Sequence, residues 1–195
     1  MTEDKRRRLP NPVALAALAL LAGMMASFWA AGGRDALDGP FGAVDRSIGS
    51  LVRNTEPHAM SDIVFTEAGG QTRRLSEWRG QTVILNLWAA WCAPCKAEMP
   101  SLDRLEAQLG DDGFAVIAVS VDKTGFKEPA AFFAREGISR LKLFNDSTGE
   151  ASLRLGAPGL PYTAVLNGKG QQVARVTGPA EWDSPAMIAQ LRSLR

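Results

Sequence analysis

The sequence predicts an α/β domain in which helices flank a mixed central sheet, with an N-terminal β-hairpin extension and a single N-terminal transmembrane helix. Three features of the sequence support this fold. From residue 83 onward, short apolar runs typical of buried strands alternate with stretches of helical spacing. The last third of the chain carries two strand-like runs joined by a glycine-rich turn and followed by a helical segment. Near the N-terminus, residues 13–31 contain no charged side chain.

The N-terminal apolar stretch is long enough to cross a membrane. At about 1.5 Å per residue, residues 13–31 reach roughly 28 Å, close to the thickness of the bilayer core. Basic side chains occupy positions 5–8 and only Arg34 follows closely, so the positive-inside rule leaves residues 1–12 as a cytoplasmic tail. The rest of the chain would then lie in the periplasm, held by the inner membrane. A signal peptide cleaved after Gly33 is the alternative, although the sequence favours a retained anchor.

Residues 32–61 are predicted to form a juxtamembrane linker. They mix Gly, Pro, Asp, Asn and Ser with apolar residues at positions 41, 44, 48 and 51, the spacing of a short amphipathic helix. His58, the only histidine of the chain, falls in this linker and is interpreted as structural. Residues 62–195 are long enough for one globular domain, and the net charge of +1 does not suggest a nucleic-acid partner.

Within residues 62–195 the expected elements follow from local patterns. The segments from Ile63 to Phe65 and up to Arg74 flank a Gly-Gly turn, which predicts a hairpin. Residues 83–88 form a nearly continuous apolar run, typical of a central strand. The remaining elements are a helix ended by Gly110, a strand at 114–121, a helix at 129–136, a strand at 141–144, a helix at 148–155, strands at 162–166 and 172–176, and a helix at 184–194.

The only two cysteines lie in Trp91-Cys92-Ala93-Pro94-Cys95, where the central strand leads into the next helix. Two cysteines are too few for a structural zinc site, so their spacing predicts a working dithiol. At a helix N-terminus, unpaired N–H groups and the helix dipole stabilise a thiolate, which makes Cys92 the expected nucleophile. Cys95, one turn further, is the expected resolving thiol, and Pro94 suits the first helical turn. We expect a redox-active disulfide between Cys92 and Cys95, and no bound metal or cofactor.

Two further places are candidates for the site. Glu98 follows Cys95 by three residues, so it lies on the same helical face and is able to shuttle a proton to it. A solvated acid of the first helical turn is the alternative. The Leu160-Pro161 bond precedes a strand, where either a cis peptide or a trans proline is compatible with the sequence.

Residues 62–195 resemble the thioredoxin superfamily, specifically its membrane-anchored TlpA-like branch, which also contains ResA-like and CcmG-like reductants. The resemblance lies in the segments Asn86–Pro100 (with Trp91 and the dithiol), Gly159–Thr163 and Gly178–Trp182. It implies a thioredoxin-like fold in which Pro161 is cis beside the sulfurs and the backbone around Leu160 docks a client chain. It also implies a functional acid at Glu98. Thioredoxin has a buried Asp where Asn86 stands here.

The resemblance implies a thiol:disulfide oxidoreductase that reduces client disulfides in cytochrome oxidase copper-site or cytochrome c biogenesis. Its partners would be proteins with exposed cysteines or disulfides and a membrane electron donor of the CcdA/DsbD type. The segment 156–163 departs from the CcmG-like pattern, which favours a TlpA-like role. Whether the protein reduces or oxidises its clients stays open at this point. The alternative from a different class is a copper(I)-binding assembly factor that uses the same two cysteines without redox turnover.

Overall fold

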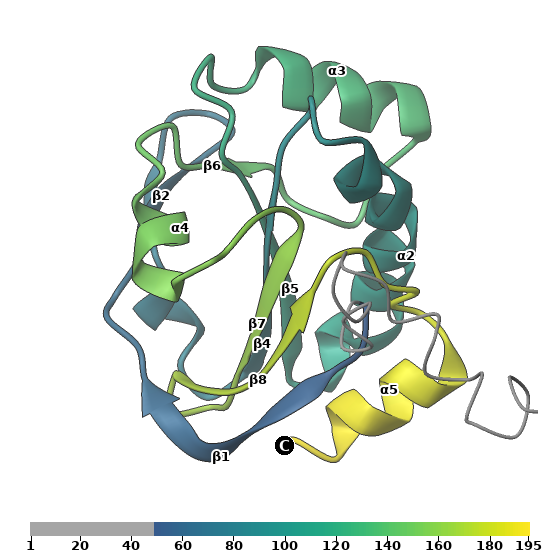
Figure 1. Cartoon of the computed structure of the whole chain (residues 1–195). Helices are drawn as coiled ribbons and strands as arrows, with labels where there is room; N and C mark the ends of the chain where they lie inside the picture. The colour runs from purple at the N-terminus through teal and green to yellow at the C-terminus, as the bar shows by residue number, and fades with distance from the viewer. Residues whose placement is uncertain (1–48) are drawn as a thin grey trace, which may run out of the picture. The chain divides into compact units, whose positions relative to one another are not determined.

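A computed structural model describes residues 49–195, which form one mixed eight-stranded sheet with helices on both faces (Figure 1). The strand order is β1-β8-β7-β4-β5-β6-β2-β3. Only β4–β5 and β5–β6 are parallel pairs, and the other neighbouring strands are antiparallel. The strands are β1 (Val52–Ala59), β2 (Val64–Glu67), β3 (Thr72–Arg74), β4 (Thr82–Trp88), β5 (Phe114–Ser120), β6 (Phe144–Asn145), β7 (Tyr162–Leu166) and β8 (Gln171–Thr177). The predicted mixed sheet is therefore confirmed.

The centre of the sheet is β4, and all its residues are buried. Its apolar side chains alternate between two hydrophobic clusters, one on each face of the sheet. β4 pairs in parallel with β5 from Thr82 opposite Phe114 to Trp88 opposite Ser120. The carboxyl ends of both strands therefore meet at one edge of the sheet. Residues 89–92, which contain Trp91 and Cys92 and are named here the Trp-Cys loop, begin there.

Three helices cover one face of the sheet and a shorter one covers the other. α2 (Ala93–Leu109), α3 (Lys127–Glu136) and α5 (Pro185–Arg192) contribute to the same hydrophobic cluster, whereas α4 (Glu150–Leu155) belongs to the second. Figure 1 shows α2 and α5 on one side of the strands and α4 on the opposite side. Two 3-10 helices, η2 (Leu75–Trp78) and η3 (Gly110–Asp112), complete the described elements.

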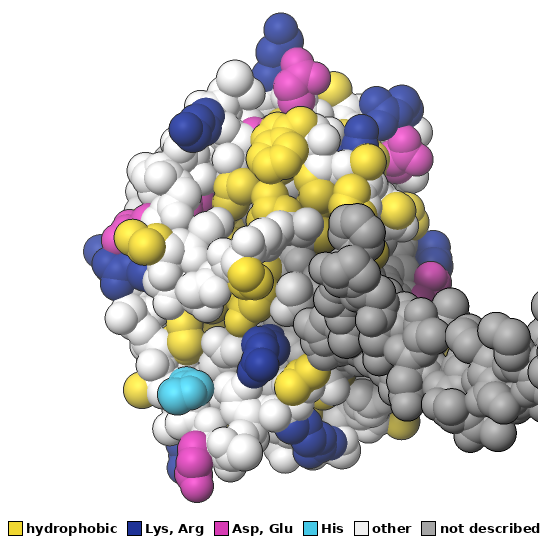
Figure 2. All heavy atoms as spheres, in the orientation of Figure 1, with side chains coloured by type: hydrophobic (Ala, Val, Ile, Leu, Met, Phe, Trp, Pro, Cys, Tyr) yellow, Lys and Arg dark blue, Asp and Glu magenta, His cyan; other side chains and the backbone are white. Residues whose placement is uncertain are grey.

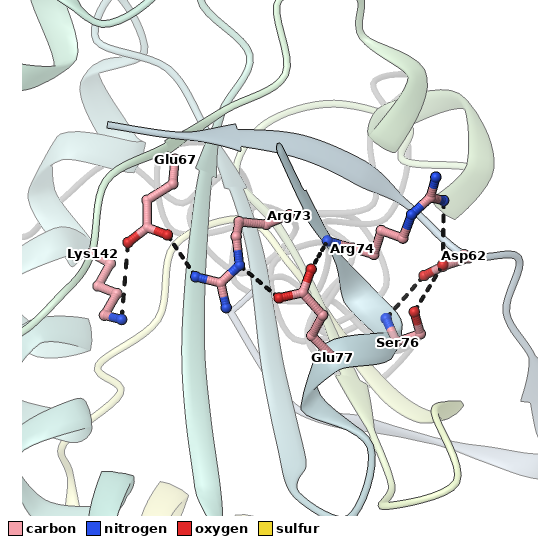
Figure 3. Close-up of polar contacts among 7 residues, drawn as sticks. All are labelled: Asp62, Glu67, Arg73, Arg74, Ser76, Glu77 and Lys142. Carbon is pink, nitrogen blue, oxygen red and sulfur yellow. Dashed lines mark hydrogen bonds and ion pairs between the residues drawn. The ribbon is translucent and has the colours of Figure 1, made fainter. Parts of the chain in front are cut away.

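The hairpin predicted before the central strands is confirmed. β2 pairs with β3, with Val64 opposite Arg74. Arg73 lies between Glu67 and Glu77, with nitrogen–oxygen distances of 2.6 and 2.7 Å, and Figure 3 shows this chain of ion pairs along the hairpin and η2. These partly exposed ion pairs connect the two strands of the hairpin with η2.

The sheet begins earlier than expected, because β1 lies within the range predicted as a linker. β1 is an edge strand paired with β8, with Val52 opposite Arg175 and His58 opposite Gln172. Most of its side chains are exposed, so its sequence lacks the alternation of apolar residues that marks a half-buried strand. β1 is held by backbone hydrogen bonds with β8. Such bonds do not depend on the side chains, so the sequence pattern does not indicate them.

The predicted basic tail, membrane anchor and amphipathic helix fall on residues 1–48, outside the described residues, except that Leu51 directly precedes β1. Among residues 49–195 no helix is both long and apolar enough to span a bilayer. The strand expected at 141–144 is reduced to Phe144 and Asn145. Asp103 of α2 explains the difference, because its Oδ1 accepts the N–H of Leu141 at 2.9 Å in place of a strand partner.

Candidate active site

The two cysteines form a disulfide at the N-terminus of α2, with a Cα–Cα distance of 5.3 Å. Cys92 is the N-cap residue, and its Sγ accepts the N–H of Cys95 at 3.3 Å. Cys92 is 6 % exposed and Cys95 is 0 % exposed. Cys92 therefore lies at the positive end of the helix and is the only residue of the pair with any exposed surface.

The loop that carries Cys92 is held in place by a buried acid just beyond β5. Asp122 Oδ2 accepts the N–H of Ala90 at 2.8 Å and the hydroxyl of Ser120 at 2.7 Å. Trp91, next in the chain, is 70 % exposed, and Pro94 is exposed in the first turn of α2. Asp122 is not among the residues predicted from the sequence, although an acid directly after a buried strand was a signal for a residue at this edge of the sheet.

The Leu160-Pro161 peptide bond is cis, which decides between the two alternatives left by the sequence. Tyr162, the next residue, begins β7 opposite Leu87 near the end of β4. Pro161 thus lies at the end of the sheet from which the Trp-Cys loop departs. Its carbonyl oxygen accepts the N–H of Gly178 at 3.0 Å.

Glu98 is enclosed on the same side of the sheet as α2 and is only 3 % exposed, so it is not a solvated acid. Its Oε1 accepts a hydrogen bond from Asn86 Nδ2 at 2.8 Å. Its Oε2 accepts two, from the N–H of Ala180 at 3.1 Å and from the indole Nε1–H of Trp182 at 2.9 Å. Three donors from two distant parts of the chain therefore converge on one carboxylate.

Burial raises the pKa of Glu98 to about 7, and the hydrogen bonds from Trp182, Asn86 and Ala180 oppose this rise. An acid with a pKa near ambient pH both accepts and releases protons readily. Cys95 lies one helical turn before Glu98 on α2 and is fully buried.

The segment from Gly178 to Trp182, named here the 178–182 turn, supplies partners that the sequence analysis did not assign. The segment was recognised as a whole, but neither the backbone N–H of Ala180 nor the indole of Trp182 was given a role. A tryptophan among small and polar residues after the last strand was the available signal. From the sequence, Asn86 stood out only because thioredoxin has an Asp at its position. Its Nδ2 also donates a hydrogen bond to Thr163 Oγ1 at 2.9 Å.

Residues 55–191 match the sequence profile of the Redoxin family, well over half of the chain. The chain belongs to the Redoxin family. The thiol:disulfide interchange protein HelX of Rhodobacter capsulatus is 33% identical over 104 residues, which cover 53% of this chain and 56% of HelX. The thiol-disulfide oxidoreductase ResA of Bacillus thuringiensis is 26% identical over 117 residues, covering 60% of this chain and 66% of ResA.

Among solved structures, a DsbE-type thiol:disulfide interchange protein of Chlorobium tepidum has a TM-score of 0.63 at 24% identity, covering 71% of this Redoxin-family chain and 96% of that one. This likeness confirms the thioredoxin-like fold. The matches to HelX and ResA span between about half and two thirds of those relatives. The resemblance to the TlpA-, ResA- and CcmG-like branch is confirmed.

Proposed function

We propose that the chain is a thiol:disulfide oxidoreductase that works through Cys92 and Cys95. The observation that carries this proposal is the disulfide at the N-terminus of α2, in which only Cys92 has any exposed surface. A thiolate at this position is stabilised by the helix N-terminus, and it is the nucleophile that disulfide exchange requires. The names of HelX and ResA support the same class of reaction.

The exchange proceeds in two steps. The Cys92 thiolate attacks one sulfur of a client disulfide, which forms a mixed disulfide and releases the other client sulfur as a thiolate. Cys95 then loses its proton to Glu98 and attacks Cys92 Sγ, which frees the client as a dithiol and restores the internal disulfide. Two electrons pass from the protein to the client, whose two sulfurs take up the proton that Cys95 released to Glu98 and one proton from solvent.

The client binds over the accessible side of the disulfide. Trp91 and Pro94 are exposed on either side of Cys92 in the chain, and the half-buried Leu160 precedes the cis proline. Figure 2 shows hydrophobic side chains gathered in a band on the face of the domain drawn there. The backbone at Leu160 is free of the regular ladder of β7, which starts at Tyr162, and it pairs with an extended client segment.

The family branch and the N-terminal sequence support a direction and a location for the reaction. The protein acts as a reductant in the periplasm, held to the inner membrane by residues 13–31. Its clients carry exposed cysteines or disulfides and take part in cytochrome oxidase copper-site or cytochrome c biogenesis. A membrane electron donor of the CcdA/DsbD type returns it to the dithiol form.

The reduction potential and client trapping test this proposal. Equilibration with glutathione should give a potential nearer the reducing value of about −270 mV of thioredoxin than the oxidising value of about −120 mV of DsbA. In membranes, a Cys95→Ala variant should accumulate disulfide-linked clients through Cys92, and a Cys92→Ser, Cys95→Ala double variant should not. A potential near the oxidising end contradicts the reductant role, and equal adducts in both variants contradict the assignment of Cys92.

The anchor is tested separately by membrane extraction of the full chain. A retained helix should keep the protein in the membrane fraction at alkaline pH, with its N-terminus intact. Release into the soluble fraction, with a mature N-terminus near residue 34, would instead show signal-peptide cleavage.

A further inference from the structure

The 178–182 turn joins β8 to α5 and is bound to the rest of the site at both ends. At one end, the N–H of Gly178 donates to the carbonyl oxygen of the cis Pro161 at 3.0 Å. At the other end, the N–H of Trp182 donates to Ser101 Oγ of α2 at 3.2 Å. Between these anchors the turn presents two donors to Glu98, so its position and that of the acid depend on each other.

Trp182 makes the shorter of the two contacts with Glu98 Oε2, at 2.9 Å against 3.1 Å for the N–H of Ala180. Its side chain is fully buried, so water does not replace the indole as a donor. An indole N–H only donates, and a donor in a region of low dielectric favours the ionised carboxylate over the neutral acid.

Two donors on Oε2 also decide which oxygen carries the proton of the neutral acid. The two groups that contact Oε2, the N–H of Ala180 and the indole N–H of Trp182, only donate hydrogen bonds. A proton on Oε2 would therefore find no acceptor in either of them. Oε1 meets a single partner, the amide of Asn86. Within residues 49–195, the Oδ1 atom of that amide has no hydrogen-bond partner. A rotation of the amide would let Oδ1 accept an O–H from Oε1 and the hydroxyl of Thr163, in exchange for the two hydrogen bonds that Nδ2 donates to these groups.

We propose that Trp182 is a positioning residue for Glu98: its indole N–H holds Oε2, stabilises the carboxylate, and leaves Oε1 as the oxygen that receives and releases the proton. The role rests on the proposed exchange reaction, in which Glu98 accepts the proton of Cys95. Trp182 itself touches neither sulfur nor client in this scheme.

Few other groups close to Glu98 are able to shift its pKa. β4 contributes the neutral Asn86, and the 178–182 turn contributes Ala180 and Trp182. No charged side chain is among the causes of its shifted pKa. Glu181 of the turn is exposed and lies 3.5 Å from Arg104. On α2 itself, the titratable neighbour is Cys95 in the reduced protein.

The direct test is the pKa of Glu98 in the full-length oxidised protein, read by carbon-13 NMR of labelled glutamate carboxyl groups. In the wild type, Glu98 should titrate with a midpoint near its pKa of about 7, which results from its burial and its hydrogen bonds. Trp182→Phe removes the donor and should raise the midpoint by about one pH unit, since a hydrogen bond to a charged group is of that order.

Trp88→Phe is the matched control. Trp88 lies in the same hydrophobic cluster and is also fully buried, but its Nε1 has no hydrogen-bond partner within residues 49–195. This variant makes a similar cavity without removing a bonded donor, so its Glu98 midpoint should stay at the wild-type value. A midpoint in Trp182→Phe no higher than in Trp88→Phe overturns the proposal.

A second variant covers the case in which Trp182→Phe does not fold. The sulfur isostere of tryptophan, benzothienylalanine, placed at position 182 keeps the shape of the ring system and lacks the N–H. It should raise the Glu98 midpoint as Trp182→Phe does. An unchanged midpoint with the isostere overturns the proposal on its own.

The exchange rate separates positioning from general damage. In the reduced protein, Trp182→Phe should move the pH profile of mixed-disulfide resolution upward by the same interval as the Glu98 midpoint. In a Glu98→Gln background it should leave the profile unchanged, and an equal effect in both backgrounds overturns the proposal. The NMR titration needs no turnover, so it tests the role of Trp182 even in a protein that shows no exchange activity. Absence of exchange activity would contradict the proposed function and leave the result of the titration unaffected.

Discussion

Replacing Glu98 by Gln should make the protein more stable at alkaline pH relative to the wild type, even though it changes a buried, fully hydrogen-bonded side chain. The pKa of Glu98 rises from 4.5 to about 7 on folding, with burial as the main cause. The folded state therefore binds more protons than the unfolded state between these values, and stability falls as pH rises through this window. The loss is complete above about pH 7 and absent well below pH 4.5.

The size of the effect follows from the same interval. Each pKa unit corresponds to about 1.4 kcal/mol, so the ionisation of Glu98 costs about 3 kcal/mol at pH 8 and about 1 kcal/mol at pH 5. Gln does not ionise and avoids this cost. The stability difference between Glu98→Gln and wild type should therefore shift in favour of the variant by about 2 kcal/mol between pH 5 and pH 8.

The site is able to accommodate the Gln side chain. Its oxygen still accepts from Ala180 and Trp182, and its NH2 group then faces Asn86. Rotation of the Asn86 amide presents Oδ1, which has no partner in the described part of the chain, to that NH2 group and to the hydroxyl of Thr163, which then donates to Oδ1 in place of accepting from Nδ2. A large loss of stability at both pH values is therefore not expected.

Urea unfolding of the oxidised full-length protein at pH 5 and pH 8 measures this difference. Glu181→Gln is the control, because Glu181 belongs to the same turn but is exposed to solvent. Its stability difference from wild type should hardly change between the two pH values. If Glu98→Gln also shows no pH-dependent gain, or loses stability at pH 8, the raised pKa and the mechanism built on it are wrong.

Three further predictions follow from the geometry. In the reduced protein, iodoacetamide should alkylate Cys92 much faster than Cys95, since only Cys92 has exposed surface, and mass spectrometry showing equal rates would contradict the assigned nucleophile. Asp122→Ala should lower the free energy of unfolding by about 1–3 kcal/mol, because it removes the acceptor of the buried Ser120 hydroxyl and of the part-buried N–H of Ala90. Gly49→Ala should destabilise the protein more than Gly125→Ala in the same urea assay. Both glycines have positive φ, but only at Gly49 does a new Cβ lie 2.5 Å from a backbone oxygen of the 178–182 turn. Equal losses for the two variants would show that this contact relaxes freely.

The local parts of the site were predictable from the sequence. The dithiol, its place between a buried strand and a helix, and the order of accessible and buried cysteines depend on spacings of a few residues. Helical and strand periodicity report such neighbours directly. The same holds for the hairpin at residues 63–74, whose turn chemistry is contained in one short segment.

Tertiary structure alone decided what surrounds these residues. Glu98 and Trp182 are separated by 84 positions, and their hydrogen bond exists only because the 178–182 turn folds back against α2. Burial there raises the pKa of Glu98, an acid whose role the sequence left ambiguous, to about 7. β1 likewise joins the sheet through backbone pairing with β8, which side-chain pattern does not encode. Periodicity describes one element at a time, whereas desolvation and long-range hydrogen bonds depend on which elements meet.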